Sequence, residues 1–332
     1  MIISRTPFRV SFFGGGSDYP AWYRENGGAV LATTIDKYCY ISCRYLPPFF
    51  EHKYRIVYSK IENVREISEI QHPAVRAVLQ WLECTRGVEI HHDGDLPARS
   101  GLGSSSSFTV GLINTMMALN GRYISKEENA RLAIHIEQNI IKENVGSQDQ
   151  VSAAFGGFNI IEFDQQDSFR VIPLILPLER LKELESHLML FFTGLTRTAS
   201  DIARSKIENI PRRKTEIRRI QESVDEAVSI LRGDDNPISE FGRLLDESWQ
   251  YKKSLSPDVS SQRIDEIYEA ARKAGAIGGK ILGAGGGGFI LLFVKPEQQQ
   301  KVREALSSLV YVPFSFENSG SKIVLYQPSG LA

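Results

Sequence analysis

The residues with the clearest chemical potential form a glycine- and serine-rich loop at 97–107, between an apolar strand and an amphipathic helix. Gly101 and Gly103 carry no Cβ, so they allow positive φ angles and let a ligand approach the main chain closely. From Ser104 onward, apolar residues recur at helical spacing: Phe108, Leu112, Ile113, Met116 and Leu119. Backbone N–H groups and the positive end of the helix dipole should therefore point into the loop, with the serines capping the helix. This geometry suits a phosphate, although serines after glycines also form linkers and simple helix caps.

Acidic residues stand at several predicted turns and helix ends. Glu137 lies near the C-terminal end of a helix predicted to start with a capping box at Ser125, and a carboxylate there opposes the helix dipole. We therefore expect another group to compensate the charge of Glu137. Asp149 is, by its residue type alone, typical of the first turn of a helix. Asp18 follows three glycines and a serine after a β-prone segment, where a tight turn is the simplest interpretation.

Hydrophobic periodicity predicts the elements that must position these residues. Strands are predicted at 29–35, 38–45, 54–58, 88–92, 158–163, 169–172, 188–192, 289–294, 311–316 and 322–326, and helices at 73–82, 104–119, 264–273 and 296–306. Apolar stripes on either side of residues 233–237 predict an antiparallel helix pair. The glycines at 283, 285 and 288 have the spacing of a dinucleotide loop, but a buried strand follows them where that site needs a helix. The pattern predicts an α+β fold with two domains, 1–172 and 173–332.

The composition excludes several classes of partner. The 332 residues include 39 Lys and Arg against 40 Asp and Glu, which gives no global field for nucleic acid or an anionic membrane. No apolar run approaches the ~20 residues needed to span a bilayer, and the start lacks the layout of a signal peptide, so we expect a cytoplasmic protein. The three cysteines are expected to be reduced packing residues rather than metal ligands. The sequence is compatible with a homodimer.

Three segments together resemble the signatures of the GHMP kinases, a family of small-molecule kinases. Residues 97–107 resemble the nucleotide loop of the family, residues 7–19 its first signature and residues 278–289 its third. The resemblance implies the two-domain GHMP kinase fold, with a ribosomal S5 domain 2-like N-terminal domain and a ferredoxin-like C-terminal domain. It also implies that ATP and a small-molecule acceptor meet between the domains, where the γ-phosphoryl group moves to a hydroxyl.

The same resemblance implies roles for individual residues. Asp149 would take the acceptor proton with electrostatic help from Arg9, and Mg²⁺ would be held by Glu137 and the hydroxyl of Ser105. The residues expected to bind ATP are Pro97, Ser100, Gly101, Leu102, Gly103, Ser104, Ser105 and Ser106. The residues expected to contact the acceptor are Gly15, Gly16, Ser17, Asp18, Arg197, Lys280, Gly285 and Gly286.

Within the family, these segments are most similar to the D-glycero-D-manno-heptose 7-phosphate kinases, which phosphorylate the anomeric hydroxyl of a sugar phosphate for lipopolysaccharide or capsule synthesis. Gly15 and Gly16 stand where galactokinases have Glu-His, which argues against galactose. Arg197 and Lys280 are the candidates for the 7-phosphate. The alternatives are another sugar 1-kinase, such as a fucokinase-like one, and a sensor that binds ATP and sugar without turnover. The presence of Glu137 and Asp149 favours catalysis.

Overall fold

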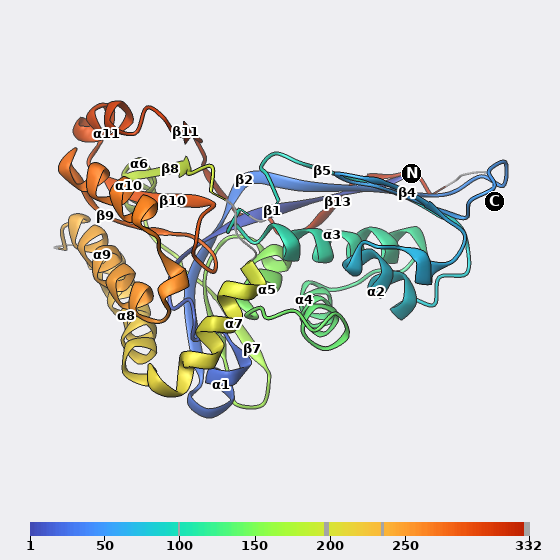
Figure 1. The fold of residues 1–332 in the computed structure, drawn as a ribbon, viewed down its shortest axis with the longest axis horizontal. Coiled ribbons are helices and arrows are strands. Elements are labelled where there is room, and N and C mark those ends of the chain that lie inside the picture. The colour runs from blue at the N-terminus through green and yellow to red at the C-terminus, as the bar shows by residue number, and fades with distance from the viewer. Residues whose placement is uncertain (99, 196–198, 234–235, 329–332) are drawn as a thin grey trace.

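The computed structural model describes residues 1–98, 100–195, 199–233 and 236–328. Arg197, one of the residues expected at the acceptor site, lies outside the described residues. Two sheets with helices packed on them make up the described part of the chain (Figure 1). None of the helices in these ranges is both long and apolar enough to cross a membrane.

The first sheet is built around two long strands, β1 (Ile2–Phe13) and β2 (Gly28–Tyr45). Among the described residues it has nine strands with the main order β13-β1-β2-β5-β3-β4, while β6 and β12 also pair with β2 and β7 pairs with β6. The other strands are β3 (Tyr54–Val57), β4 (Ile61–Val64), β5 (Val88–Gly94), β6 (Phe158–Phe163), β7 (Phe169–Pro173), β12 (Phe316–Glu317) and β13 (Lys322–Tyr326).

This sheet contains β4, which was not predicted from the sequence, and it differs from the prediction in two further respects. The strands expected separately at 29–35 and 38–45 form one strand, because a shift in register opposite Pro7 and Phe8 lets β1 continue to pair past Asp36 and Lys37. The strand expected at 311–316 is split: Val310–Tyr311 pairs in the second sheet, whereas β12 pairs with β2. The strand expected at 322–326 is β13, which pairs with β1 instead of joining the second domain. The chain thus returns to the first sheet at its C-terminal end, and this pairing joins residues far apart in sequence that no local pattern connects.

Four helices of the described part of the chain lie along one face of the first sheet (Figure 1): α2 (Pro73–Trp81), α3 (Ser104–Leu119), α4 (Lys126–His135) and α5 (Gln148–Phe155). A further helix, α1 (Pro20–Asn26), connects β1 to β2 at the lower end of the view. Both α3 and α5 pack on β1 and β2, so the N-terminal ends of these two helices are brought to the same strands. The predicted capping box at Ser125 is confirmed, since its hydroxyl accepts from the N–H of Glu128 at 3.2 Å and the Glu128 carboxylate accepts from the N–H of Ser125 at 2.9 Å.

The second sheet has the order β11-β8-β10-β9. Its strands are β8 (Leu188–Phe192), β9 (Ala276–Ile281), β10 (Phe289–Val294) and β11 (Val310–Tyr311), and its helices are α6 (Leu178–Ser186), α7 (Ala199–Asn209), α8 (Lys214–Arg232), α9 (Ser239–Ser254), α10 (Gln262–Lys273) and α11 (Gln299–Ala305). The succession strand, helices, two strands, helix, strand with antiparallel pairing is the ferredoxin-like arrangement that we expected. The predicted antiparallel pair is confirmed as α8 and α9 (Figure 1).

Candidate active site

The glycine and serine loop runs into α3 through Gly103, which is the N-cap residue with φ 74° and no side-chain cap. The expectation that the serines cap this helix is wrong, because the cap position is held by a residue without a side chain. The Ser106 and Ser107 hydroxyls point elsewhere, donating to Glu137 Oε2 and to the Pro7 carbonyl, each at 2.9 Å. The cap position therefore brings no acceptor side chain of its own, which suits a phosphate at the start of α3.

A second glycine loop, between β9 and β10, lies directly against the first. A Cβ on Gly101, whose φ is 84°, would lie 2.6 Å from the Leu282 carbonyl oxygen, so only glycine allows this approach. The Phe289 N–H donates to the Ser100 carbonyl at 3.1 Å. The expected strand, glycine turn and strand beside the phosphate loop are thus confirmed, and the contact joins the two sheets at the site.

We predict that Gly101→Ala disturbs both this contact and nucleotide binding. Alanine at this position would combine an unfavourable positive φ, costing about 1–2 kcal/mol, with a clash against the backbone of Leu282. Chemical denaturation should show a loss in the free energy of unfolding that is larger than the cost of the positive φ alone, and the KM for ATP should rise. Gly121→Ala is the matched control, because Gly121 has φ 68° but no atom within 4 Å of its Cβ position. Equal losses in the two variants would contradict the role of the contact.

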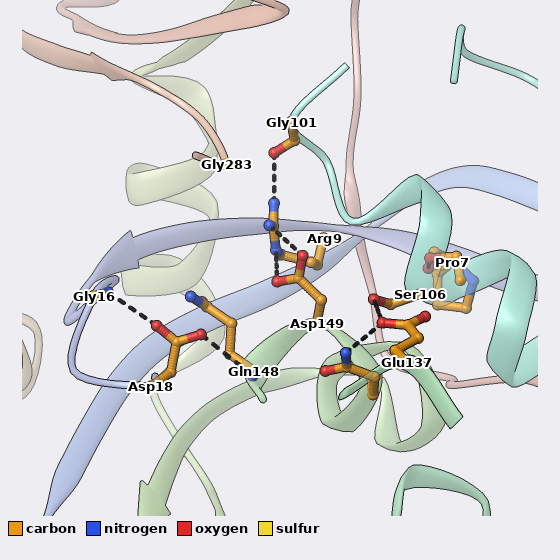
Figure 2. Close-up of polar contacts among 12 residues, drawn as sticks. Pro7, Arg9, Gly16, Asp18, Gly101, Ser106, Glu137, Gln148, Asp149 and Gly283 are labelled. Carbon is orange, nitrogen blue, oxygen red and sulfur yellow. Dashed lines mark hydrogen bonds and ion pairs between the residues drawn. The ribbon is translucent and has the colours of Figure 1, made fainter. Parts of the chain in front are cut away.

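Arg9 on β1 holds Asp149, in the first turn of α5, beside the phosphate loop (Figure 2). Arg9 Nε and Nη2 donate to Asp149 Oδ1 and Oδ2, both at 2.8 Å, and Nη1 donates to the Gly101 carbonyl at 2.6 Å. A Cβ on Gly103 would lie 3.5 Å from Asp149 Oδ2, so the carboxylate nearly touches the loop. The Arg9 side chain is 4% exposed and that of Asp149 26%, which leaves the carboxylate accessible to a bound molecule.

Asp18 lies beside Gln148, the residue before Asp149, on the side away from the phosphate loop in Figure 2. The Gly16 N–H donates to Asp18 Oδ1 at 2.9 Å, and the Gln148 N–H donates to Oδ2 at 3.4 Å. Burial is the main cause that raises the pKa of Asp18, and the nearby charge of Asp149 adds to it. A buried carboxylate in this position can accept hydrogen bonds from the hydroxyls of a ligand.

Glu137 lies in a π-helical segment, Ile136–Ile140, that continues α4. Its Oε2 accepts from Ser106 Oγ at 2.9 Å and from Gln150 Nε2 at 2.5 Å, and the Thr109 hydroxyl also lies near the carboxylate. Its buried Oε1 accepts no hydrogen bond from the described residues. Burial raises the pKa of Glu137 to about 7. These donors supply part of the compensation that we expected, and a buried carboxylate oxygen without a partner fits a cation.

The hydroxyl beside Glu137 differs from the one that we expected. We expected Ser105 to share a metal with Glu137, but Ser106 makes the contact, and Ser105 is exposed on the first turn of α3. Within the described residues no cluster of three or more His, Cys, Asp or Glu side chains could hold a metal. A cation at Glu137 would therefore take further ligands from the bound phosphates.

Other residues expected at the acceptor site lie around the same turn. A Cβ on Gly15 would lie 3.7 Å from both Ser11 Oγ and Gln148 Nε2. The Ser17 hydroxyl is buried within hydrogen-bond distance of two carbonyl oxygens of the turn and β2, so it stabilises the turn. Lys280 Nζ donates to the Phe12 carbonyl at 2.7 Å, and burial lowers its pKa to about 7.

The expected glycines of the third signature lie beside Val259, in the short 3₁₀ helix Pro257–Val259 that follows α9. The Gly286 N–H donates to the Val259 carbonyl at 2.9 Å, and a Cβ on Gly285 would lie 2.8 Å from the same oxygen. This close packing explains the need for glycine at 285, where φ is 113°.

Sequence reasoning missed two buried lysines at the site, Lys206 on α7 and Lys252 on α9. Both could have been recognised from the sequence, because each lysine occupies a position on the apolar face of its helix. Lys206 follows Ala203 by three residues, and Lys252 follows Trp249 by three. A lysine at such a position is rarely buried unless its ammonium meets polar groups, which for Lys252 are the carbonyl oxygens of Ile281 and Gly283.

A cavity of about 600 Å³ opens where the two sheets meet, at the beginning of the phosphate loop. Its lining residues are Asp36, Lys37, Asp95, Leu96, Pro97, Phe192, Phe289, Val310, Tyr311, Val312 and Pro313. Aromatic and aliphatic side chains supply most of this wall, which suits a flat apolar ring. Of the residues expected to bind ATP, Pro97 is the one that lines this cavity.

The site has the parts of a phosphoryl-transfer enzyme. These are a loop and helix start suited to phosphates, a carboxylate that an arginine fixes beside the loop, and a further buried carboxylate. The known families agree with this class. Residues 69–157 match the GHMP kinases N terminal domain, and residues 227–312 match the GHMP kinases C terminal domain. The chain belongs to the GHMP kinase family, and it is an ATP-dependent phosphotransferase.

Individual relatives are also similar over long stretches. The chain is 31% identical to D-glycero-alpha-D-manno-heptose 7-phosphate kinase of Campylobacter jejuni, covering 97% of this chain and 98% of that protein. It is 26% identical to the bifunctional fucokinase/GDP-fucose pyrophosphorylase of Arabidopsis thaliana, over 89% of this chain but 30% of that protein. A crystal structure of a D-glycero-D-manno-heptose 1-phosphate kinase from Bacteroides thetaiotaomicron superposes with a TM-score of 0.77 at 28% identity, covering 97% of this chain and 98% of that one.

Proposed function

We propose that this protein transfers the γ-phosphoryl group of ATP to the anomeric hydroxyl of D-glycero-D-manno-heptose 7-phosphate. The product would be the 1,7-bisphosphate, used for nucleotide-activated heptose in surface polysaccharide. The name and full-length similarity of the Campylobacter jejuni relative support this substrate. ATP as the donor favours a cytoplasmic site for the reaction.

The observation that carries the proposal is the Asp149 carboxylate, which Arg9 fixes against the phosphate loop. In the reaction Asp149 accepts the proton of the anomeric hydroxyl while the hydroxyl oxygen forms a bond to the γ-phosphorus. The bond from that phosphorus to the bridging oxygen breaks, and ADP leaves with the electron pair. An anomeric hydroxyl is more acidic than an ordinary alcohol, so a carboxylate is a sufficient base. Arg9 adds positive charge beside the transferred group, where it stabilises the transition state.

The proposal assigns binding positions to the metal and to the base of ATP. Glu137 and Ser106 would hold Mg²⁺, whose charge neutralises the phosphate oxygens when it is bound. The base of ATP would occupy the cavity at Pro97, because its wall is largely apolar and it adjoins the phosphate loop. Asp18 would accept hydrogen bonds from the sugar hydroxyls on the other side of Asp149.

A panel of acceptors tests the proposal. Heptose 7-phosphate, free heptose, L-fucose, galactose and mevalonate are each incubated with ATP and Mg²⁺, ADP release is followed, and the product is examined by phosphorus NMR. We expect the largest acceptor-dependent ADP release with heptose 7-phosphate, together with the signal of a new anomeric phosphate. A preference for L-fucose would instead support a fucokinase-like function, which the Arabidopsis thaliana relative makes the second candidate. Nucleotide binding without ADP release for any acceptor would support a sensor.

A further inference from the structure

Lys206 is a buried cation that the proposed mechanism does not use. It lies on the inner face of α7 and is 5% exposed, with its Nζ 5.2 Å from the centre of the Tyr19 ring. Its ammonium makes no hydrogen bond or ion pair with any other residue that the structure describes. Nζ itself is not fully buried, so its three N–H donors, unpaired within the described residues, face space that a bound molecule can enter. The position therefore indicates a ligand that brings acceptor oxygens.

The two other buried lysines of the site differ from Lys206 in this respect. Lys252 Nζ donates to the carbonyls of Ile281 and Gly283, both at 2.7 Å, and Lys280 Nζ donates to the carbonyl of Phe12 at 2.7 Å. These two lysine side chains link the second glycine loop and β9 to the rest of the site. Lys206 differs because its ammonium donates to no acceptor within the described residues.

The charges around Lys206 place it on the acceptor side of the site. Asp18 exerts the strongest attraction on its ammonium, ahead of Asp149, while Arg9 repels it. Burial outweighs these attractions and lowers the pKa of Lys206 to about 8. Tyr19, over which the ammonium lies, directly follows Asp18 in the chain, whereas the phosphate loop adjoins Arg9 and Asp149. A group at Lys206 therefore belongs to the acceptor and not to the triphosphate.

The chemistry of the surroundings favours an anion over a hydroxyl as that group. Basic side chains outnumber the carboxylates of Asp18 and Asp149 in this cluster, because Lys252 and Lys280 lie near Lys206 and Arg9. Burial lowers the pKa of both Lys252 and Lys280, and a bound anion would favour their protonated forms. A phosphate monoester supplies both negative charge and several acceptor oxygens. We propose that Lys206 binds the phosphate that the sugar substrate already carries, and so makes the enzyme prefer a phosphorylated sugar. This inference rests on the proposed function, and Lys206 is a specificity-determining residue in it.

Kinetics with two matched acceptors test the inference. For the wild type, Lys206→Met and Lys206→Arg, kcat/KM is measured with heptose 7-phosphate and with free heptose. We expect Lys206→Met to lower the preference for the phosphorylated sugar by roughly 20- to 100-fold, the scale of one hydrogen bond to a charged group, with the KM for ATP unchanged. Lys206→Arg should retain most of the preference, because it retains the charge. Arg204→Met is the control, since Arg204 is exposed on the same helix.

The outcomes separate this inference from the function on which it rests. A wild type inactive with every sugar phosphate would overturn both. An active wild type whose preference survives in Lys206→Met, or whose kcat falls equally with both sugars, would overturn the role of Lys206 alone. If the wild type does not turn over free heptose, calorimetric binding of heptose 7-phosphate decides, with a 20- to 100-fold rise in Kd expected for Lys206→Met and an unchanged Kd contradicting the inference.

Discussion

Asp149→Asn is expected to lower kcat by about 100-fold or more while ATP still binds, because the variant removes a positioned general base. The amide can still accept one hydrogen bond from Arg9 through its oxygen, but its NH₂ group would face the second Arg9 donor, which now meets Asp149 at 2.8 Å. The phosphate loop and the cavity at Pro97 are unaltered, so a nucleotide titration should give a Kd close to that of the wild type. ADP release and nucleotide binding are therefore measured on the same preparation.

The control for this variant is Asp167→Asn. Asp167 also accepts from an arginine, Arg24 Nε at 2.7 Å, but the pair is about half exposed and lies outside the site. We expect its turnover to match that of the wild type. If Asp149→Asn kept a kcat within a few-fold of the wild type, Asp149 would not be the base and the mechanism would be wrong.

Glu137→Gln is expected to weaken the dependence on Mg²⁺ and to lower kcat. A glutamine can keep the hydrogen bonds from Ser106 and Gln150 through its oxygen, while its NH₂ group replaces the buried Oε1 that has no partner among the described residues. The variant should therefore fold but lose the carboxylate that a cation needs. Thermal unfolding with ATP and increasing Mg²⁺ measures this without turnover, and the wild type should gain more stability than the variant. An identical Mg²⁺ titration for both proteins would rule out Glu137 as a metal ligand.

The same variant should be more stable than the wild type at pH 8 in metal-free buffer. Burial raises the pKa of Glu137 from 4.5 to about 7 in the folded state, so between these values the folded protein binds the extra proton. The stability that a protonated Glu137 gives is complete below pH 4.5 and is lost as the pH rises through about 7. At pH 8 we expect the free energy of unfolding of Glu137→Gln to exceed that of the wild type by about 3 kcal/mol, and this difference should shrink toward pH 4.5.

Denaturation curves across this pH range check the expectation. Glu162→Gln is the control, because Glu162 is 40% exposed in an ion pair with Arg170 and should show little change with pH. A stability difference for Glu137→Gln that does not vary with pH would contradict the role assigned to the buried carboxylate.

Several elements could be predicted because their signals are local. The apolar spacing after Ser104 predicted α3, and the residues at Ser125 predicted the start of α4. The buried strand after the glycines at 283–288 excluded a dinucleotide site and predicted β10. Each of these patterns depends on the conformation of a few neighbouring residues, so no distant contact was needed to find it.

Other features depend on contacts between distant residues and could not be predicted in this way. The pairing of β13 with β1 joins the two ends of the chain, although the strand pattern at 322–326 is equally compatible with either sheet. On the first turn of α3, helical geometry turns Ser106 inward and leaves Ser105 exposed, but only the packing of α4 against α3 decides which hydroxyl meets Glu137.

The sequence by itself determined the family, the three loops and the residue types able to bind phosphate, because these follow from local backbone conformation and motif order. Only the tertiary structure decided that Arg9 pairs with Asp149, that Ser106 rather than Ser105 reaches Glu137, and that Lys206 is buried over the Tyr19 ring. The physical reason is that the strength of a charge or hydrogen bond depends on burial and on which partners lie within a few ångströms, and packing of distant segments sets both.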